Sequence, residues 1–278
     1  MYKRQGYLGG GLLLALNLLM ISKPALFGIS TVTLATQISF ITVAVWWFIF
    51  SLPAFKYLPA PEKRVEKIPL AKYTKMAFGR LKSTFVHIRK YRELWKFLLA
   101  FWIYNDGIGT IIRMATIYGR EVGIGQTDLI GALLLTQFIG IPFALIFAKI
   151  AGKVTAKKGI YLALTIYTAI TFYGYFLDSA LDFWILAGIV GMVQGGAQAL
   201  SRSLYGAMVP ESKSAEFFGF YGVSSKFAAI IGPTVFAYAG QLTGSSRYGI
   251  IAVASFFVLG IIFLSRVDVE KGKLEAKS

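Results

Sequence analysis

Residues 248–265 read YGIIAVASFFVLGIIFLS and contain no charged side chain. An α-helix rises about 1.5 Å per residue, so a stretch of this length is sufficient to cross the hydrocarbon core of a bilayer, which is about 30 Å thick. Inside lipid, every backbone donor and acceptor needs a partner within the protein, and an open sheet edge would leave these groups unpaired. The stretch therefore predicts a transmembrane helix.

Seven other stretches of the chain have the same apolar character and a comparable length. Of the 278 residues, 56% are hydrophobic and 15% are charged, whereas soluble domains have about 45–50% and about 25%. A water-soluble globule could not bury so many apolar side chains, which excludes a soluble single-domain enzyme. We predict an all-α fold, a polytopic membrane helical bundle with eight transmembrane helices. The other seven predicted spans are 7–28, 31–52, 95–117, 128–149, 159–177, 181–205 and 217–241.

The positive charges lie between the apolar stretches and predict the orientation of the chain. Its 29 Lys and Arg outnumber its 13 Asp and Glu. Twelve of the 29 lie between Lys56 and Lys96, and four more lie in the turn at 149–158. Because Lys and Arg are retained on the cytoplasmic side, we expect both segments and both chain termini to be cytoplasmic. The net charge of +16 is then a topology signal, and it does not indicate a nucleic-acid partner.

A secretory signal over residues 1–29 is the competing interpretation of the first span, since Lys3 and Arg4 precede it. Such signals end in a small-x-small cleavage site. No convincing site follows here, and seven further predicted spans come after it. The first span is therefore better explained as one helix of the bundle.

The hydrophilic segment at 53–94 divides the chain into three units. We predict two transmembrane helices at 1–52, a basic cytoplasmic linker at 53–94 and a six-helix half-bundle at 95–278. Prolines predict an extended start to the linker, whereas residues 71–92 place apolar side chains on one face of a basic amphipathic helix. That helix either lies on an anionic leaflet or is simply solvated. Its apolar face consists of Phe78, Leu81, Phe85 and Ile88.

Six spans preceded by only two are typical of the later part of a twelve-span chain built as six plus six. We therefore expect that the first four spans of such a chain are missing here. Alternating access requires two half-bundles that rock about a central site, and two spans plus six do not supply them. This piece alone is expected not to transport unless it pairs with another chain.

The third predicted span contains Asn105 and Asp106, followed by Arg113. Asp106 and Arg113 are seven residues apart, which places them on the same side of a helix about 10 Å apart along its axis. An ionised side chain at mid-membrane costs about 2.5–3.5 kcal/mol, so such residues usually face the bundle interior or water. Two interpretations stay open. Asp106 binds solute or a proton with Arg113 as its counter-charge, or the two form a structural pair from which Arg113 can extend outward.

The sixth span carries a polar stripe, because Gln194, Gln198 and Arg202 repeat every four residues. Gly191 and Gly195 form a small-xxx-small pair that allows another helix to approach closely. The combination suits a helix that lines a cavity while it packs against a moving partner. Interhelical hydrogen bonding alone is the alternative explanation.

The seventh span contains Lys226 and the pair Gly232-Pro233. Proline lacks a backbone donor, so a kink is expected there. Lys226 is expected to face a cavity, to pair with Glu211 or Glu216, or to extend to the membrane surface. The predicted solute pathway is Asn105, Asp106, Arg113, Gln137, Gln194, Gln198, Arg202 and Lys226, and the predicted packing or hinge residues are Gly191, Gly195, Gly196, Gly232 and Pro233.

Enzyme and cofactor motifs are poor in this sequence. The chain has no cysteine and a single histidine, His87, so neither thiolate nor histidine metal clusters can form. Gly107 and Gly109 lack the third glycine of a dinucleotide-binding turn, and no phosphate-binding loop with its Lys-Ser/Thr ending is found. We therefore predict no catalytic residues, no metal and no cofactor.

Several of these segments resemble the vacuole effluxer branch of the major facilitator superfamily. The resemblance covers nearly the whole chain, and it implies a major facilitator-like fold with two helices of an N-terminal half and a complete six-helix C-terminal half. The first span here would match the family's fifth. The segments that carry it are QGGAQALSRS at 194–203, EFFGFY at 216–221, KFAA at 226–229, IGP at 231–233, YNDG at 104–107 and GGG at 9–11.

One inside turn departs from the superfamily pattern. Ala148, Gly152 and Thr155 stand where the superfamily usually has Gly, Asp and Gly. The carboxylate that caps a neighbouring helix is therefore missing, which puts in doubt how this half latches its inner gate.

The resemblance implies secondary active transport by alternating access in a membrane, here a prokaryotic inner membrane, and fungal relatives export amino acids from the vacuole. We hypothesise a transporter of a small polar or zwitterionic, amino-acid-like solute, since an Asp and two Arg complement an ammonium and a carboxylate. The expected partners are the lipid bilayer, that solute and a candidate coupling proton. The alternative is a non-transporting membrane scaffold or truncated fragment whose basic linker recruits partners.

Overall fold

A computed structural model describes residues 2–57, 69–153 and 155–277. Throughout these residues the regular elements are helical, which confirms the all-α fold class. Proline residues 59 and 61 of the predicted extended segment lie outside the described residues. In chain order the elements are α1 (Tyr2–Ser22), η1 (Pro24–Phe27), α2 (Val32–Tyr57), α3 (Leu70–Ile88), α4 (Arg92–Glu121), α5 (Gln126–Lys153), α6 (Ala156–Tyr175), α7 (Ala180–Ala207), η2 (Glu211–Lys213), α8 (Ser214–Ala228), α9 (Ile231–Thr243), α10 (Ser246–Ser265) and α11 (Val269–Glu275).

Four helices among the described residues have both the length and the apolar composition of a membrane span. They are α2, α5 over Gln126–Phe147, α7 and α10. The chain is therefore an integral membrane protein of the helical class. The count of eight spans stays a prediction.

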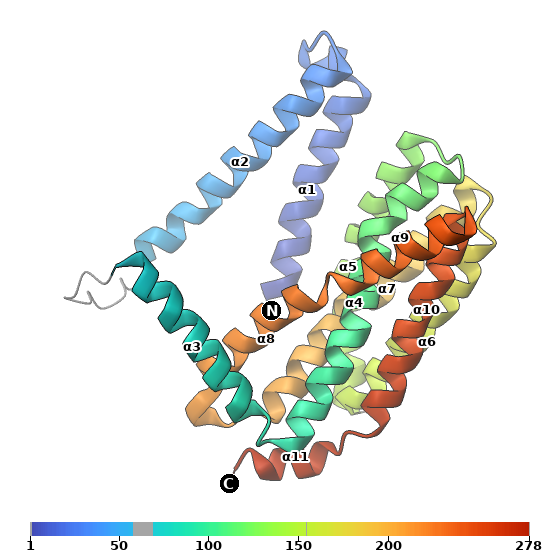
Figure 1. The fold of residues 1–278 in the computed structure, drawn as a ribbon. Coiled ribbons are helices and arrows are strands. Elements are labelled where there is room, and N and C mark those ends of the chain that lie inside the picture. The colour runs from blue at the N-terminus through green and yellow to red at the C-terminus, as the bar shows by residue number, and fades with distance from the viewer. Residues whose placement is uncertain (1, 58–68, 154, 278) are drawn as a thin grey trace.

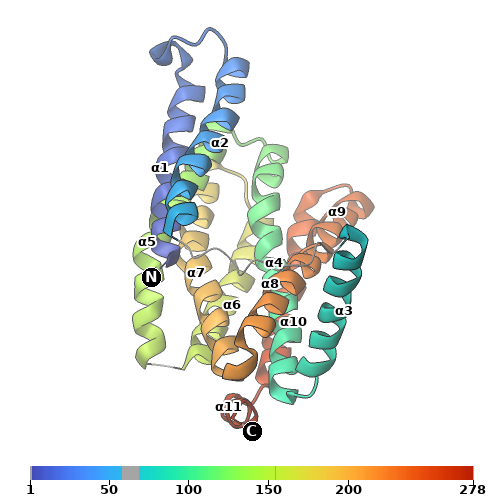
Figure 2. The ribbon, with the colours of Figure 1, turned by 90° about the vertical axis from the view of Figure 1, so that its left-hand side faces the viewer.

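The molecule consists of an arm and a body (Figure 1). The arm is the α1–α2 hairpin, in which α1 packs on α5 while α2 contacts mainly α1. The body is the bundle of α4 to α10, in which α5 packs extensively on α7, and α10 packs on α4, α6 and α9. Viewed from the side, the arm stands beside α5, while α3 lies along α8 and α4 (Figure 2).

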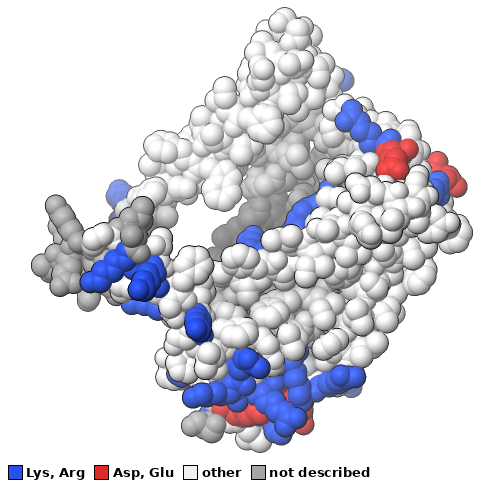
Figure 3. Space-filling model, in the orientation of Figure 1, with Lys and Arg blue, Asp and Glu red and all other residues white. Residues whose placement is uncertain are grey.

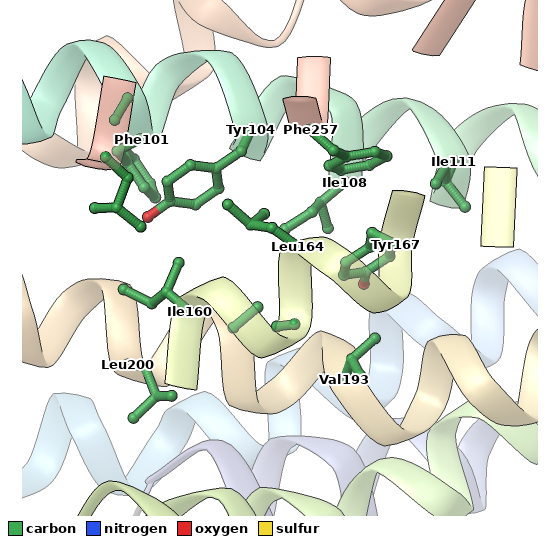
Figure 4. Packing of buried hydrophobic residues seen from close by; sticks show 14 of the residues in the cluster. Phe101, Tyr104, Ile108, Ile111, Ile160, Leu164, Tyr167, Val193, Leu200 and Phe257 are labelled. Atoms are coloured by element: carbon green, nitrogen blue, oxygen red, sulfur yellow. The ribbon is translucent and has the colours of Figure 1, made fainter. Parts of the chain in front are cut away.

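The core of the body lies where α4, α6, α7 and α10 meet (Figure 4). Tyr104 of α4, Tyr167 of α6 and Phe257 of α10 are all fully buried there. The rings of Tyr167 and Phe257 stack with their centroids 5.2 Å apart. Near the C-terminal end of α4, the Tyr118 hydroxyl donates to the Gly174 carbonyl over 2.6 Å and so ties α4 to α6. These contacts hold α4 in place, and α4 carries the charged residues of the third predicted span.

The seventh predicted span, 217–241, is wrong as one continuous helix. The structure divides it into α8 and α9, which are 15 and 13 residues long and are separated at Ala229 and Ile230. Pro233 explains the break, because it cannot donate to the carbonyl four residues earlier, and its ring clashes with that carbonyl. The predicted kink is thus a full interruption, and it begins one helical turn before the proline.

The second part of the segment predicted as a linker is helical, as expected, while its assignment as a cytoplasmic linker stays a prediction. Residues 70–88 form the helix α3, and Leu81, Phe85 and Ile88 pack against the core, whereas Phe78 is exposed. The Thr84 hydroxyl donates to Glu216 of α8 over 2.5 Å. The apolar face of α3 therefore packs largely on the body rather than being solvated. In the first part, α2 continues as a helix through Pro53 to Tyr57, past the expected end at residue 52.

Candidate functional site

Asp106 of α4 binds the beginning of α9. Its Oδ2 accepts a hydrogen bond from the backbone N–H of Gly232 over 2.6 Å, and the side chain is buried, with 1% of its surface exposed. The first N–H groups of any helix lack partners within the helix, so a carboxylate there satisfies a donor and complements the helix dipole. Position 232 must be glycine for this contact, since a Cβ would lie 2.0 Å from Thr110 Oγ1 and 2.9 Å from Asp106 Oδ1.

Arg113 binds the other side of the same break. Its Nη1 donates to the carbonyl oxygen of Ala229 over 2.7 Å. Ala229 lies four residues before Pro233, so its carbonyl is the one that the proline leaves without a helical donor. Arg113 therefore satisfies the acceptor that the proline exposes.

The two ends of the interruption have opposite partial charges, and α4 supplies the complement of each. The end of α8 is the negative end of its dipole and receives a guanidinium, while the beginning of α9 is positive and receives a carboxylate. Asp106 and Arg113 thus share one face of α4, as their spacing predicts, but they are joined through the broken helix. The ion pairs among the described residues do not include this pair.

A polar cavity of about 470 Å³ lies between α4, α7 and α8. It collects five of the eight predicted pathway residues, from three different predicted spans. Figure 3 shows Lys and Arg atoms on the wall of a hollow between the α2 arm and the α8–α9 side of the body. The predicted residues that line the cavity are Asn105, Arg113, Gln198, Arg202 and Lys226.

The cations of this cavity have no carboxylate partner among the described residues. The Arg202 guanidinium lies over the ring of Phe218, 5.2 Å from its centroid. Lys226 forms none of the ion pairs found in the described part of the chain. Glu216, one of its two expected partners, accepts its hydrogen bond from Thr84.

Aromatic packing fixes the walls of the cavity. Phe101 of α4 stacks on Tyr221 of α8 at a centroid distance of 4.4 Å. The Tyr104 hydroxyl and Ser201 Oγ are 2.7 Å apart, which ties α4 to α7 one residue before Arg202. The three helices that carry the polar side chains are therefore held at fixed distances.

The other predicted pathway residues lie elsewhere. Gln137 and Gln194 share a second cavity of about 100 Å³ whose lining is mostly apolar, between α4, α5, α6, α7 and α10. Asp106 lines an apolar cavity against α8 and α10 instead of the polar one. The stripe Gln194, Gln198 and Arg202 is thus divided between two cavities.

Two of the predicted packing glycines, Gly191 and Gly196, lie at the contact between α5 and α7. A Cβ at Gly191 would lie 2.9 Å from the carbonyl oxygen of Thr136, and one at Gly196 would lie 2.2 Å from Phe147 Cγ. Gly195 is buried in the same helix. Gly191 and Gly196 therefore allow α5 and α7 to approach each other closely.

Gly109 is a residue of the cavity lining that the sequence analysis missed. A Cβ there would lie 3.1 Å from Arg113 Nη2, so the absence of a side chain gives the guanidinium room to fold back along α4. The available signal was a glycine four residues before an arginine in an apolar helix, because residues at this spacing are neighbours on a helix surface.

The turn predicted at 149–158, which departs from the superfamily pattern, leads into α6. Its Thr155 caps that helix, since the Thr155 hydroxyl oxygen accepts from the Lys158 N–H over 3.4 Å.

No group of three His, Cys, Asp or Glu side chains able to hold a metal occurs within the described residues. The cavity instead offers guanidinium, ammonium and amide groups, which bind and orient small polar molecules.

Comparison with known proteins gives a consistent result. The family model described as "Vacuole effluxer Atg22 like" matches residues 4–277. A Bacillus subtilis protein named as an uncharacterized MFS-type transporter, YxiO, is 39% identical over 267 residues, which are 95% of this chain and 61% of that protein.

Fungal proteins named for autophagy match as well. Autophagy-related protein 22-1 of Aspergillus niger is 23% identical over 295 residues, covering 98% of this chain and 47% of that protein. Autophagy-related protein 22 of Coccidioides immitis is 24% identical over 274 residues, covering 88% and 45%. The chain thus spans about half to three fifths of the length of these relatives. The family and YxiO are named for efflux and transport and not for an enzymatic activity, as the lack of enzyme motifs predicts.

Proposed function

Because the chain belongs to the Atg22-like vacuole effluxer family, we propose that it is part of a secondary active transporter that moves a small, amino-acid-like solute by alternating access. The solute binds in the cavity between α4, α7 and α8. The observation that carries this proposal is a single polar cavity beside a broken helix. Its lining brings together Asn105, Gln198 and Arg202 with two further cations, Arg113 and Lys226. Broken helices beside a polar cavity are a common construction of transporter binding sites.

The proposed topology has eight crossings. Four crossings are the helices of span length, α2, α5, α7 and α10. The other four are α1, α4, α6 and the α8–α9 pair, because α8 and α9 are each too short to cross the membrane alone. The units 1–52, 53–94 and 95–278 are then an N-terminal pair, a linker and a C-terminal half. Lys and Arg gather at the end of the molecule that carries α11 and the C-terminus, and along α3, which supports a cytoplasmic position of that end (Figure 3). We propose that both termini are cytoplasmic and that the membrane is a bacterial inner membrane.

A coupling proton has a candidate acceptor in Asp106. One of its oxygens accepts from Gly232, while the other, Oδ1, has no hydrogen-bond partner among the described residues. A proton on this buried group would remove the charge that faces the positive end of α9. Proton binding would in this way weaken the joint between α8 and α9.

The test is uptake and efflux of labelled amino acids in vesicles that contain the full-length gene product. Transport is expected, and Arg202→Gln is expected to reduce it by at least about tenfold, as loss of one charged contact usually does. Arg120→Gln is the matched control, since Arg120 is an exposed arginine near the end of α4, outside the cavity. Unchanged transport in both Arg202→Gln and Asp106→Asn would contradict the assignment of the site.

A non-transporting scaffold is the second candidate function. The feature in its favour is α3, whose lysines and arginines stay exposed while its apolar face packs on the body. A scaffold predicts that the full-length product binds partners through α3 and moves no labelled solute. Vesicle transport that is abolished by Arg202→Gln would exclude this alternative.

A further inference from the structure

We infer that the solute carries a net negative charge and is a small organic carboxylate held between Arg113, Arg202 and Lys226. This inference rests on the proposed function and deepens it, since the zwitterion expected from the sequence depends on Asp106 as the partner of an ammonium group. The structure changes that charge balance.

The first step is the position of Asp106. Its Oδ2 is engaged by the Gly232 N–H at 2.6 Å, and its side chain lines the apolar cavity next to α8 and α10. The lining of the polar cavity does not include it. An ammonium group in the polar cavity would therefore not reach this carboxylate.

The second step is the charge of the cavity lining. Within the described residues, the lining contains three cations and no Asp or Glu. Arg113 donates to a neutral carbonyl, Arg202 lies over an aromatic ring, and Lys226 has no ion-pair partner in the same residues. Cations at membrane depth usually pair with an opposite charge or line a water-filled path. A bound anion supplies that opposite charge.

The third step is the remaining chemistry of the cavity. Asn105, Gln198 and Ser225 add neutral donors and acceptors around the cations. The volume of about 470 Å³ lies in the range of pockets for small organic molecules, roughly 300–1,000 Å³. Guanidinium groups favour carboxylates, because their planar donors match the two oxygens. A small carboxylate with a net negative charge and further polar groups fits this lining, whereas a zwitterion of zero net charge would leave the three cations uncompensated.

The experiment compares L-glutamate with L-glutamine, which have nearly the same shape and differ by one negative charge. Binding of each radiolabelled compound to the purified full-length gene product is measured at pH 7.5 and low salt. We expect L-glutamate to bind on the order of tenfold more tightly, and the difference to shrink as salt is added. In the double variant Arg202→Gln/Lys226→Gln the preference should be lost.

Two further variants make a folding defect visible. Arg202→Lys keeps the positive charge and should keep the preference for L-glutamate, although with weaker binding. Arg120→Gln removes an arginine outside the cavity and should change neither compound's binding.

Equal binding of the two compounds, tighter binding of L-glutamine, or no binding of either would overturn the inference. So would a preference that survives in the double variant. Vesicle transport separates this failure from that of the proposed function. Transport of L-glutamine without preference for L-glutamate would overturn the anion inference alone, whereas selective L-glutamate binding without any transport would overturn the proposed function alone.

Discussion

Helices α2 of the arm and α10 of the body are both long and apolar enough to cross a membrane, but their surroundings differ. Only 6% of the apolar window of α2 is buried, against 39% in α10. Trp47 of α2 is 71% exposed, whereas Phe257 of α10 is fully buried. Hydropathy alone therefore predicts that a helix crosses the membrane and does not predict whether lipid or protein surrounds it.

Glycine distinguishes the two helices better. α2 contains none, whereas α10 has Gly249 against the Phe236 carbonyl of α9 and Gly260 against Tyr104 of α4. Helices in a membrane associate by close packing, because lipid chains are as apolar as leucine. Glycine at a contact thus marks the helices that pack on protein, and the following experiments test this difference between arm and body.

The largest effect is expected from Gly196→Val at the contact between α5 and α7. Even the first carbon of the new side chain would lie 2.2 Å from Phe147 Cγ, so the two helices must separate. We expect a loss of about 3 kcal/mol in the free energy of unfolding, at the upper end for overpacking. Denaturant unfolding of the purified protein in detergent, followed by far-UV circular dichroism, measures it.

Ala44→Val in the arm is the matched control for this substitution. Ala44 is exposed on α2 and should accept the larger side chain with a change of less than about 0.5 kcal/mol. Equal destabilisation by the two substitutions would contradict the distinction between a closely packed body and a sparsely packed arm.

The next effect concerns the joint between α8 and α9. Asp106→Ala removes the acceptor of the buried Gly232 N–H and should cost about 1–3 kcal/mol, the usual cost of an unsatisfied buried donor. Asp106→Asn keeps an oxygen that can accept this hydrogen bond and should cost less than half as much. The same denaturant titration compares them, and equal losses would show that the carboxylate charge, not the hydrogen bond, stabilises the joint.

The roles of Asp106 and Arg113 show how far the sequence could predict the site. Their spacing of seven residues correctly placed them on one face of a helix, and the cost of burying charge indicated that they face the interior. The actual partners of both are backbone groups of residues more than one hundred positions later. Backbone groups become available only where a helix breaks, and Pro233 predicts a break without predicting which side chain will satisfy it.

The fold was predictable to a greater extent than the site. Long apolar stretches and the periodicity of 71–92 gave the helices, because both depend on local sequence alone. The division of Gln194 from Gln198 and Arg202 between two cavities depends on which helices pack on either side of α7. That packing is a tertiary property, and a single helical stripe cannot specify it.

A smaller effect is expected from Asn17→Ala in the arm. Asn17 is 7% exposed, and its Oδ1 accepts from the Thr42 hydroxyl over 2.8 Å, which ties α1 to α2. Hydrogen bonds between membrane helices contribute about 0.6 kcal/mol on average, so the global stability should barely change. The distribution of distances between spin labels on α1 and α2 should instead become broader. Gln37→Ala is the control, since Gln37 is exposed on α2. An unchanged distance distribution in Asn17→Ala would contradict this role.

The smallest expected effect is a local response to pH where α11 contacts the beginning of α4. Glu93 is buried at the beginning of α4, accepts from the Asp268 N–H over 2.8 Å and pairs with Lys96 at 2.7 Å. Burial acts to raise the pKa of Glu93, but the Lys96 contact and the Asp268 N–H outweigh it, so the pKa lies below its ordinary value of 4.5. The stabilisation is therefore complete above pH 4.5 and is lost as the pH falls through the lowered pKa.

Acidification below pH 4.5 should accordingly release α11 from α4 while the neutral Asn17–Thr42 contact of the arm stays intact. Relative to the intrinsic exchange rate at each pH, hydrogen exchange of residues 269–275 should accelerate slightly, because protonated Glu93 holds the Asp268 N–H and Lys96 less strongly. Glu93→Gln should show the faster exchange already at neutral pH, with no further acceleration on acidification. If α11 and the arm instead loosen together, the pH response is a property of the whole bundle, and α11 has no separate electrostatic attachment to α4.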